Sequence, residues 1–271
     1  MKLLSELVCS NQKNSIVKIT GITSDSREVR PGFLFAAFRG TRQDGVKFIP
    51  DAVNRGAVAV LVQSGTKINS SKALIISDDN PRNRFAKIAS RFYSSQPEWI
   101  GAVTGTNGKT SVAIFATQIL QKLGKKAAAI GTLGVQGFDS DNTLSLTTPE
   151  PVALHKELSR IASCSVSHVV IEASSHGLDQ HRLDGINCKA AAFTNLSHDH
   201  IDYHETFENY LYAKKRLFSD ILNTNGIAVI NRDSNEYNYL ETVCNEKNLK
   251  IISYGFHKES VLRLLSTSPC D

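Results

Sequence analysis

The segment "AVTGTNGKTSV", residues 102–112, contains the residue types that bind phosphate groups. Gly105, Gly108 and Lys109, followed by a threonine, match the second half of the G-x-x-x-x-G-K-[ST] motif, whose backbone N–H groups and lysine hold nucleotide phosphates. The first glycine of that motif is absent, because Val103 occupies its position. The segment therefore predicts a shortened phosphate-binding loop, and it leaves open which reaction uses it.

The residues around this loop favour nucleotide binding over an ordinary glycine turn with a solvated lysine. "WIGAVT" reads as a strand and residues 109–123 as a helix that Gly124 ends. The loop thus leads into a helix N-terminus, where backbone N–H groups converge on an anion. Lys109 would neutralise the β- and γ-phosphates of a nucleoside triphosphate, and the Thr110 or Ser111 hydroxyl would reach Mg²⁺. The predicted nucleotide-binding residues are Gly105, Thr106, Asn107, Gly108, Lys109, Thr110 and Ser111.

A carboxylate and a group of histidines could complete such a site. Glu172 lies at the end of the predicted strand "HVVIEA", and open α/β sheets bind ligands at the carboxyl ends of their strands. Five of the eight histidines fall within residues 176–204, which also suggests zinc. Mg²⁺ suits phosphate chemistry better, and no cysteine joins these histidines at a ligand spacing. The nearby "SSHG" lacks the G-x-S-x-G elbow of serine hydrolases. The histidines in question are His176, His181, His198, His200 and His204.

The elements that must position these residues alternate between strands and helices, which predicts a parallel, doubly wound α/β sheet. Helices are expected over residues 109–123, from about Pro151 and from about Glu205. Residues after "KIISYG" contain no further predicted strand. The predicted strands are "WIGAVT", "AAAIGT", "HVVIEA", "AAFTNL", "GIAVIN" and "KIISYG".

The chain before this alternation has a pattern of its own. Strands are predicted in "SIVKITGITSDS", "FLFAAF", "AVAVLV" and "ALIIS", and helices in "FIPDAVNRG" and "RNRFAKIASRFY". We predict a small N-terminal α/β domain over residues 1–97, joined through "SSQPEW" to an incomplete P-loop ATPase domain over residues 98–271. "DNPR", residues 79–82, is expected to cap the second of these helices, with Pro81 at its start.

Composition limits the classes of function. The formal charge is +5, but basic and acidic residues are interspersed, so no footprint for nucleic acid emerges. No apolar run reaches the roughly 18 residues of a membrane span, and no signal peptide is present. The five cysteines are scattered, which indicates neither a disulfide framework nor a zinc knuckle. These features predict a soluble, monomeric cytoplasmic protein that acts on small phosphorylated molecules.

One lysine stands on an apolar helix face. Phe207, Tyr210, Leu211, Leu217 and Phe218 form a stripe at helical spacing, and Lys214 lies on this stripe. Its two neighbours in sequence, Lys215 and Arg216, are predicted to lie off it. The lysine either extends its amine to solvent or has a function on the inward face.

Several longer motifs follow the phosphate loop in a fixed order. They are "LTTPEP", "IEASSHGLDQHRL", "FTNLSHDHIDYHETFENY" and "AKKRLF", and "SDSREVRPGFLFAAFRGTRQDG" precedes the loop. In this order and spacing the chain resembles the Mur ligase family, in the type that adds meso-diaminopimelate or L-lysine to UDP-N-acetylmuramoyl-L-alanyl-D-glutamate. The resemblance extends over almost the whole chain.

The resemblance implies an ATP-dependent amide ligase of peptidoglycan precursor synthesis, with ATP and Mg²⁺ as cofactors. Lys109, His200 and a carbamylated Lys214 would be catalytic, and Thr110, Glu172, His200 and Lys214 would bind the metal ion. Thr147, Thr148, Ser174, Gln180 and Arg182 would contact the muramoyl peptide. The threonines could also cap the next helix, and the two interpretations are compatible. Ser24, Ser26, Thr41, Arg42 and Gln43 would hold the UDP-sugar end.

Two alternatives and one expectation about length remain. A folylpolyglutamate synthetase-like ligase shares the loop but needs no UDP-binding domain, and a non-catalytic nucleotide-binding remnant would turn nothing over. Family members carry a third domain that binds the incoming amino acid, and this domain is expected to be absent from residues 1–271. We therefore expect this stretch of chain to be inactive alone.

Overall fold

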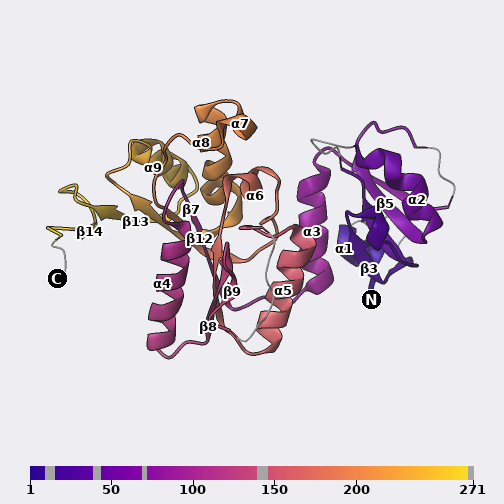
Figure 1. The fold of residues 1–271 in the computed structure, drawn as a ribbon, viewed down its shortest axis with the longest axis horizontal. Helices are drawn as coiled ribbons and strands as arrows, with labels where there is room; N and C mark the ends of the chain where they lie inside the picture. The colour runs from indigo at the N-terminus through magenta and orange to yellow at the C-terminus, as the bar shows by residue number, and fades with distance from the viewer. Residues whose placement is uncertain (10–15, 39–43, 69–71, 139–145, 268–271) are drawn as a thin grey trace. The chain divides into compact units, whose positions relative to one another are not determined.

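The computed structural model describes residues 1–9, 16–38, 44–68, 72–138 and 146–267. The chain forms two compact units. The first contains residues 1–94 together with 151–156, and the second contains residues 95–150 and those from 157 onward (Figure 1).

The first unit is built on a parallel four-stranded sheet with the order β3-β4-β5-β6. Side chains of β4 alternate between its two faces: Leu34 packs in a core with α1 and α3, and Phe35 packs in a core with α2. The elements are β1 (Lys2–Leu3), α1 (Leu4–Val8), β2 (Lys18–Ile19), β3 (Gly21–Thr23), the 3₁₀ turn η1 (Ser26–Glu28), β4 (Phe33–Ala36), the 3₁₀ turn η2 (Gly45–Phe48), α2 (Ile49–Asn54), β5 (Ala57–Gln63), β6 (Leu74–Asp78) and α3 (Pro81–Tyr93).

The "DNPR" segment begins helix α3, as predicted. The Asn80 side chain accepts a hydrogen bond of 3.1 Å from the Asn83 N–H, and Pro81 occupies the first helical position, where its missing N–H costs nothing. The segment is therefore a structural cap.

The second unit contains an eight-stranded sheet with the order β14-β13-β12-β11-β7-β10-β8-β9. All neighbouring strands are parallel except the pair β8–β9, so the predicted α/β fold with a mostly parallel sheet is confirmed. The strands are β7 (Trp99–Thr104), β8 (Ala127–Gly131), β9 (Gly134–Gln136), β10 (His168–Glu172), β11 (Cys188–Phe193), β12 (Leu222–Asn231), β13 (Lys250–Gly255) and β14 (Leu262–Arg263).

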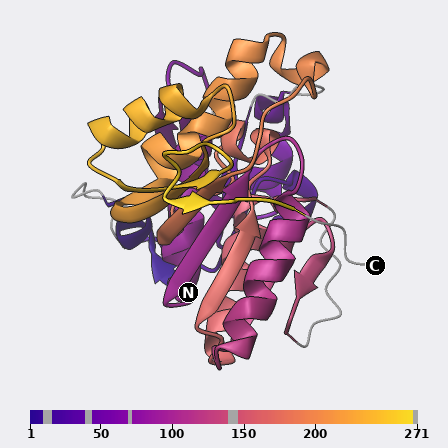
Figure 2. The ribbon, with the colours of Figure 1, turned by 90° about the vertical axis from the view of Figure 1, so that its left-hand side faces the viewer.

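Helices flank this sheet. Figure 2 shows α4, in magenta, on one face of the sheet and running alongside its strands, where it packs on β7, β8 and β10. Helix α9 packs on β12 and β13, and α8 packs against α6 and α7. The helices after β7 are α4 (Lys109–Lys122), α5 (Pro151–Ser163), α6 (Ser175–Asp179), α7 (Ile201–His204), α8 (Phe207–Arg216), the π turn η3 (Leu217–Ile221) and α9 (Tyr237–Glu246). The first part of α5, residues 151–156, is counted with the first unit.

Three expectations for this unit need correction. The strand expected at "AAFTNL" begins earlier and ends at Phe193, so Thr194 and Asn195 belong to the loop that follows. A short strand, β14, does follow "KIISYG" and pairs with β13. Arg216 was expected off the apolar stripe but is buried. Its ion pairs with Asp184 and Asp220 compensate for the burial of its charge.

Within the described residues, no helix is both long and apolar enough to cross a bilayer.

Candidate active site

The candidate site lies where four parallel strands end. The register pairs Glu172 of β10 with Val103 of β7, and Phe193 of β11 with Thr104. The phosphate loop after β7, Thr132 after β8, Glu172 and Thr194 therefore come together at one edge of the sheet. This is the edge at which open α/β sheets bind their ligands.

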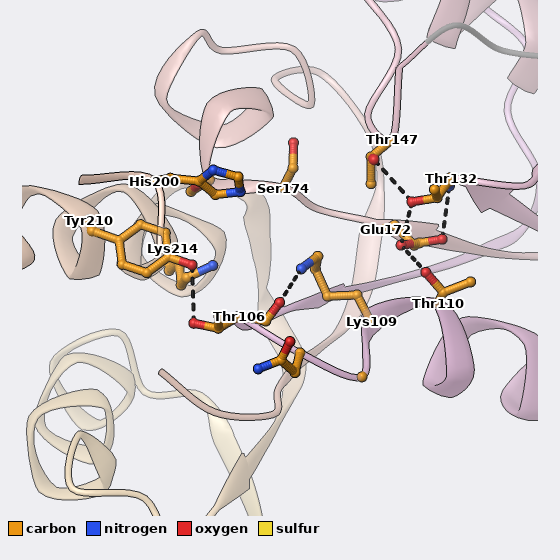
Figure 3. A pocket seen from close by; sticks show the side chains of 13 residues that line it. Thr106, Lys109, Thr110, Thr132, Thr147, Glu172, Ser174, His200, Tyr210 and Lys214 are labelled. Carbon is orange, nitrogen blue, oxygen red and sulfur yellow. Dashed lines mark hydrogen bonds between the residues drawn. The ribbon is translucent and has the colours of Figure 1, made fainter. Parts of the chain in front are cut away.

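A cavity of about 280 Å³ opens at this edge. In the view of Figure 3, Thr110, Thr132 and Glu172 lie on one side of Lys109, and His200, Tyr210 and Lys214 lie on the other. The lining residues are Thr106, Asn107, Gly108, Lys109, Thr110, Thr132, Thr147, Glu172, Ser174, Ser175, His200, Tyr210 and Lys214. Of the predicted nucleotide-binding residues, Gly105 and Ser111 lie outside this lining, and Ser111 is exposed on the first turn of α4.

The shortened phosphate loop begins with a glycine that no other residue could replace. Gly105 has φ +146°, and a Cβ atom there would lie 1.9 Å from Thr194 Oγ1. Val103, which stands at the position of the missing glycine, is buried inside β7. Lys109 Nζ donates to the backbone oxygens of Gly105 at 3.0 Å and Thr106 at 2.7 Å. The lysine of the loop thus holds the loop's own carbonyl groups.

The carboxylate of Glu172 is buried and held in a fixed orientation. It accepts hydrogen bonds from Thr110 Oγ1 at 2.8 Å, from the Thr132 N–H at 2.9 Å and from Thr132 Oγ1 at 3.3 Å. Gly131 leaves the necessary space, since a Cβ atom there would lie 2.0 Å from Glu172 Oε1. Glu172 is 2% exposed, so this network compensates for the burial of the carboxylate.

Lys214 lies on the inward face of α8 and is only 1% exposed. Its Nζ donates to the Gly105 backbone oxygen at 2.8 Å and lies 4.3 Å from the centre of the Tyr210 ring. No ion pair joins it to a carboxylate among the described residues. Burial, and secondarily the charge of Lys109, lowers the pKa of Lys214 to about 7. Its amine therefore loses its proton far more readily than an ordinary lysine does.

Histidines gather beside Lys214. The ring of His176 lies 4.8 Å from that of His200 and 5.6 Å from that of His204, and His204 lies 5.2 Å from Tyr210. Burial lowers the pKa of both His176 and His204. In the described part of the chain, no three His, Cys, Asp or Glu side chains are arranged to hold a metal ion.

Thr147 and Thr148 are tied to this site and do not cap a helix. Thr148 Oγ1 donates to the Glu172 backbone oxygen at 2.7 Å and lies 3.0 Å from Ser174 Oγ, while Thr147 Oγ1 lies 3.0 Å from Thr132 Oγ1. The cap position of α5 belongs to Glu150, whose side chain makes no capping hydrogen bond. The alternative interpretation, that these threonines cap α5, is therefore wrong.

Gln180 and Arg182 contact each other at 2.7 Å, and Arg182 also donates to the Thr148 backbone oxygen at 2.9 Å. Both lie outside the lining of the cavity. In the first unit, Ser24 is exposed and Ser26 begins η1. The remaining predicted UDP-sugar residues, Thr41, Arg42 and Gln43, lie outside the described residues.

Three residues of the site were not expected from the sequence as functional. Thr132 donates hydrogen bonds to Glu172, and Asn195 accepts one from the phosphate loop. The Tyr210 ring makes a cation–π contact with the Lys214 amine. Thr132 and Asn195 follow the ends of the observed strands β8 and β11 within two residues, whereas the sequence analysis placed both inside predicted strands. Polar residues at the carboxyl end of a predicted strand are a usable signal. Tyr210 looked like an ordinary member of the apolar stripe.

In comparisons with known proteins, models of one protein family match both units of the chain. The model described as "Mur ligase middle domain" matches residues 103–267, and the model described as "Mur ligase family, catalytic domain" matches residues 18–105. A UDP-N-acetylmuramoyl-L-alanyl-D-glutamate--2,6-diaminopimelate ligase of Brucella melitensis is 52% identical over 217 residues, 80% of this chain and 44% of that protein. The protein of the same name from Rhizobium meliloti is 51% identical over the same shares.

A solved structure of a ligase with that name is similar in fold. It superimposes with a TM-score of 0.81 at 28% identity and covers 96% of this chain and 54% of its own. The chain thus spans about half the length of the relatives it matches. With a short phosphate loop, a buried carboxylate and a buried lysine at one sheet edge, and with these matches across both units, the chain belongs to the Mur ligase family.

Proposed function

We propose that this chain provides the nucleotide-binding and UDP-substrate-binding parts of an ATP-dependent amide ligase. The ligase adds meso-diaminopimelate or L-lysine to UDP-N-acetylmuramoyl-L-alanyl-D-glutamate in peptidoglycan precursor synthesis. The observation that carries the proposal is the contact of Glu172 with Thr110 of the phosphate loop, in a cavity that also contains Lys109 and Lys214. Since ATP and the UDP-linked precursor are cytoplasmic molecules, the reaction takes place in the cytoplasm.

The reaction proceeds in two steps. A carboxylate oxygen of the glutamyl substrate attacks the γ-phosphorus of ATP, the bond to the β-phosphate breaks, and an acyl phosphate and ADP form. The amine of the incoming amino acid then attacks the acyl carbon, phosphate leaves, and the nitrogen loses a proton. Catalysis of such a transfer is mainly positioning and electrostatic stabilisation. Lys109 leaves its two backbone carbonyl partners and contacts the β- and γ-phosphates.

The oxygen donors of the site fit Mg²⁺. Thr110 Oγ1 and the Glu172 carboxylate already lie 2.8 Å apart at the edge of the phosphate loop, and oxygen ligands are those that Mg²⁺ prefers. His200 and a modified Lys214 would add ligands from the other side of Lys109. Bound there, Mg²⁺ offsets the negative charge of the phosphates and of the attacking carboxylate.

Lys214 is proposed to be carbamylated. Its amine is buried without a carboxylate partner among the described residues, and its lowered pKa leaves a neutral nucleophile near pH 7. Nitrogen attack on the carbon of CO₂, with loss of one proton, converts the amine into a carbamate anion. This anion has the oxygen donors of a carboxylate and suits a Mg²⁺ site.

The substrate's peptide end is assigned to residues beside Glu172. Thr147, Thr148 and Ser174 present hydroxyl groups at the cavity or next to it, and Gln180 and Arg182 follow on the adjoining segment. In the first unit, Ser24 and Ser26, together with Thr41, Arg42 and Gln43, are assigned to the UDP-sugar. The family match over residues 18–105 favours this ligase over a folylpolyglutamate synthetase, which needs no UDP-binding unit.

Calorimetric titration of the purified chain tests this function. We expect binding of ATP with Mg²⁺ and, separately, of the UDP-muramoyl dipeptide, and no binding of dihydropteroate. Binding of dihydropteroate in place of the UDP-muramoyl dipeptide would support the folyl ligase instead. Binding of neither carboxylate substrate would leave only a nucleotide-binding remnant.

A further inference from the structure

The phosphate loop is shorter than a full G-x-x-x-x-G-K-[ST] loop, yet its backbone is firmly held. The neighbouring segment of residues 194–197, which follows β11, makes the contacts that hold it. The Thr106 N–H donates to the Asn195 backbone oxygen at 2.9 Å, and the Asn107 N–H donates to Asn195 Oδ1 at 2.9 Å. The segment after β11 thus provides contacts to the loop where the first residues of a full phosphate-binding motif are missing.

Carbonyl and hydroxyl groups of the loop are held by the same segment. Thr194 Oγ1 donates to the Asn107 backbone oxygen at 2.7 Å, and Asn195 Nδ2 donates to the same oxygen at 3.3 Å. Thr106 Oγ1 accepts from the Ser197 N–H at 2.9 Å. The peptide groups on both sides of Asn107 are therefore fixed by the Asn195 side chain, through its acceptor and its donor.

This arrangement divides the amide groups of the loop into two sets. Those of Thr106 and Asn107 are occupied by Asn195. Those of Lys109, Thr110 and Ser111 at the start of α4 have no intrahelical partner, because the first N–H groups of any helix lack one; the Val112 N–H is the first to donate within the helix, to the Gly108 backbone oxygen. An anion can therefore be received by the helix N-terminus without competition from the first part of the loop.

We propose that Asn195 is a positioning residue for nucleotide binding, which orients the phosphate loop so that the amide groups at the start of α4 face the phosphates. It acts through the loop backbone and contacts no phosphate itself. This inference rests on the proposed binding of ATP at this loop, and it names the residue that replaces the missing part of the motif.

The test compares Asn195→Ala with Asn223→Ala by calorimetric titration with ATP and Mg²⁺. Asn223 is a matched control, because its side-chain amide donates a hydrogen bond to Asn187 Oδ1 near the amino end of β12. The phosphate loop lies at the other, carboxyl end of the strands. Without the two hydrogen bonds of the Asn195 side chain, the free loop loses its order and ATP binding must restore it, so the affinity of Asn195→Ala should be roughly tenfold to thirtyfold weaker. Asn223→Ala should bind ATP as the wild type does.

Asn195→Asp distinguishes the acceptor of the Asn195 side chain from its donor. It keeps an acceptor for the Asn107 N–H, but it loses the donor and adds a negative charge close to the phosphates. Its ATP affinity should therefore fall at least as far as that of Asn195→Ala, and high salt should reduce the difference between the two variants. Equal ATP affinity of wild type, Asn195→Ala and Asn195→Asp would overturn the inference.

Hydrogen exchange of the wild-type protein tests the inference even if the variants do not fold. Hydrogen exchange at the Asn107 amide should be slow both without nucleotide and with ADP, whereas the Lys109 and Thr110 amides should become protected only with ADP. An Asn107 amide that gains its protection only from ADP would contradict the inference. If the wild type binds no ATP at all, the proposed function fails together with this inference. If it binds ATP and the variants do the same, only the inference fails.

Discussion

Lys109 is half-buried and satisfied by backbone carbonyl groups of its own loop. Burial lowers its pKa, while the charges of Glu172 and Asp199 act in the opposite direction. A triphosphate offers this lysine charged oxygens in place of neutral ones, and such charge-assisted hydrogen bonds are about twice as strong. Exchange of the two backbone carbonyl partners for phosphate oxygens should therefore lower the free energy of the bound state.

Lys109→Ala should weaken ATP binding by roughly tenfold to a hundredfold or more, because hydrogen bonds to charged groups contribute about 1.5–3 kcal/mol. Calorimetric titration with ATP and Mg²⁺ measures the effect. Lys122→Ala, at the exposed end of the same helix, provides the control for a lost lysine charge. Unchanged affinity in Lys109→Ala would show that the backbone alone holds the nucleotide.

Lys214 should carry a carbamate in the presence of bicarbonate. The neutral amine is the form that reacts with CO₂, and a pKa of about 7 means that the neutral fraction rises as the pH rises through 7. At a fixed concentration of dissolved CO₂, the carbamate signal in ¹³C NMR should increase between pH 6 and pH 8. Lys214→Arg should lack the signal, and Lys215→Arg should keep it. A free ammonium at Lys214 with Mg²⁺ and ATP bound would refute this prediction.

The sequence indicated the individual groups of the site better than their contacts. Glu172 and the loop could be placed because strand ends and a helix N-terminus have a known geometry. Lys214 could be placed because its position on an apolar stripe is a matter of helical spacing. The hydrogen bonds of Thr132 and Asn195 could not, since they depend on which strands are neighbours in the sheet. The order of β7, β10 and β11 cannot be derived from the chain order.

At the scale of elements, a buried ion pair connects helix α8 to the segment that follows α6. Arg216 contacts Asp184 at 3.2 Å, and it also donates to the Leu178 backbone oxygen. Burial alone would raise the pKa of Asp184, but the hydrogen bond from His181 and the charge of Arg216 together hold it below its usual value. The pair fixes the helix that carries Lys214, two residues before Arg216.

Asp184→Asn should lower the free energy of unfolding by up to about 3–5 kcal/mol at pH 7, the usual cost of breaking a buried ion pair, because the exposed Asp220 compensates the charge of Arg216 only in part. Because the folded-state pKa of Asp184 is depressed, its stabilising contribution is present above the unfolded pKa and is lost as the pH falls through the folded pKa. Urea unfolding should therefore show a large difference between variant and wild type at pH 7. This difference should become smaller below about pH 4.

Asp220→Asn is the matched comparison, because Asp220 pairs with the same arginine but is exposed. Its loss should cost about 1 kcal/mol or less. Equal losses of stability in the two variants would show that burial does not distinguish these pairs.

The predicted strands were found where the chain offers continuous apolar runs, as in β7, β8 and β10, since strands of a parallel sheet are buried on both faces. Strands β9 and β14 were not expected, because three and two residues are too short to show a period. Helix α9 was also not expected, although its buried Tyr237, Leu240 and Cys244 follow helical spacing. The expected end of the strand at "AAFTNL" was too late because Thr194 and Asn195 are polar residues that contact the phosphate loop.

At the scale of the whole molecule, residues 1–271 should bind both substrates without forming the amide bond. They span about half the length of the ligases to which they are similar. Amide formation needs the incoming amine held at near-attack distance from the acyl phosphate, commonly by closure of a further part of the enzyme. A protein limited to these residues would lack whatever the other half of the relatives contributes to that positioning.

Mass spectrometry measures this outcome. Purified residues 1–271 with ATP, Mg²⁺, the UDP-muramoyl dipeptide and either diaminopimelate or lysine should yield no tripeptide product. The Lys109→Ala variant sets the background. Product clearly above that background would show that these residues alone complete the reaction.

Strand β7 has four strands on one side in the eight-stranded sheet and three on the other. The phosphate loop is therefore attached to an interior strand at one end and to helix α4 at the other. Ordering a residue of a flexible loop costs about 1–2 kcal/mol in backbone entropy. Here the surrounding sheet has already fixed those residues when the chain folds, so nucleotide binding needs little further loss of conformational entropy. The phosphate loop should consequently contribute little to the entropic cost of ATP binding.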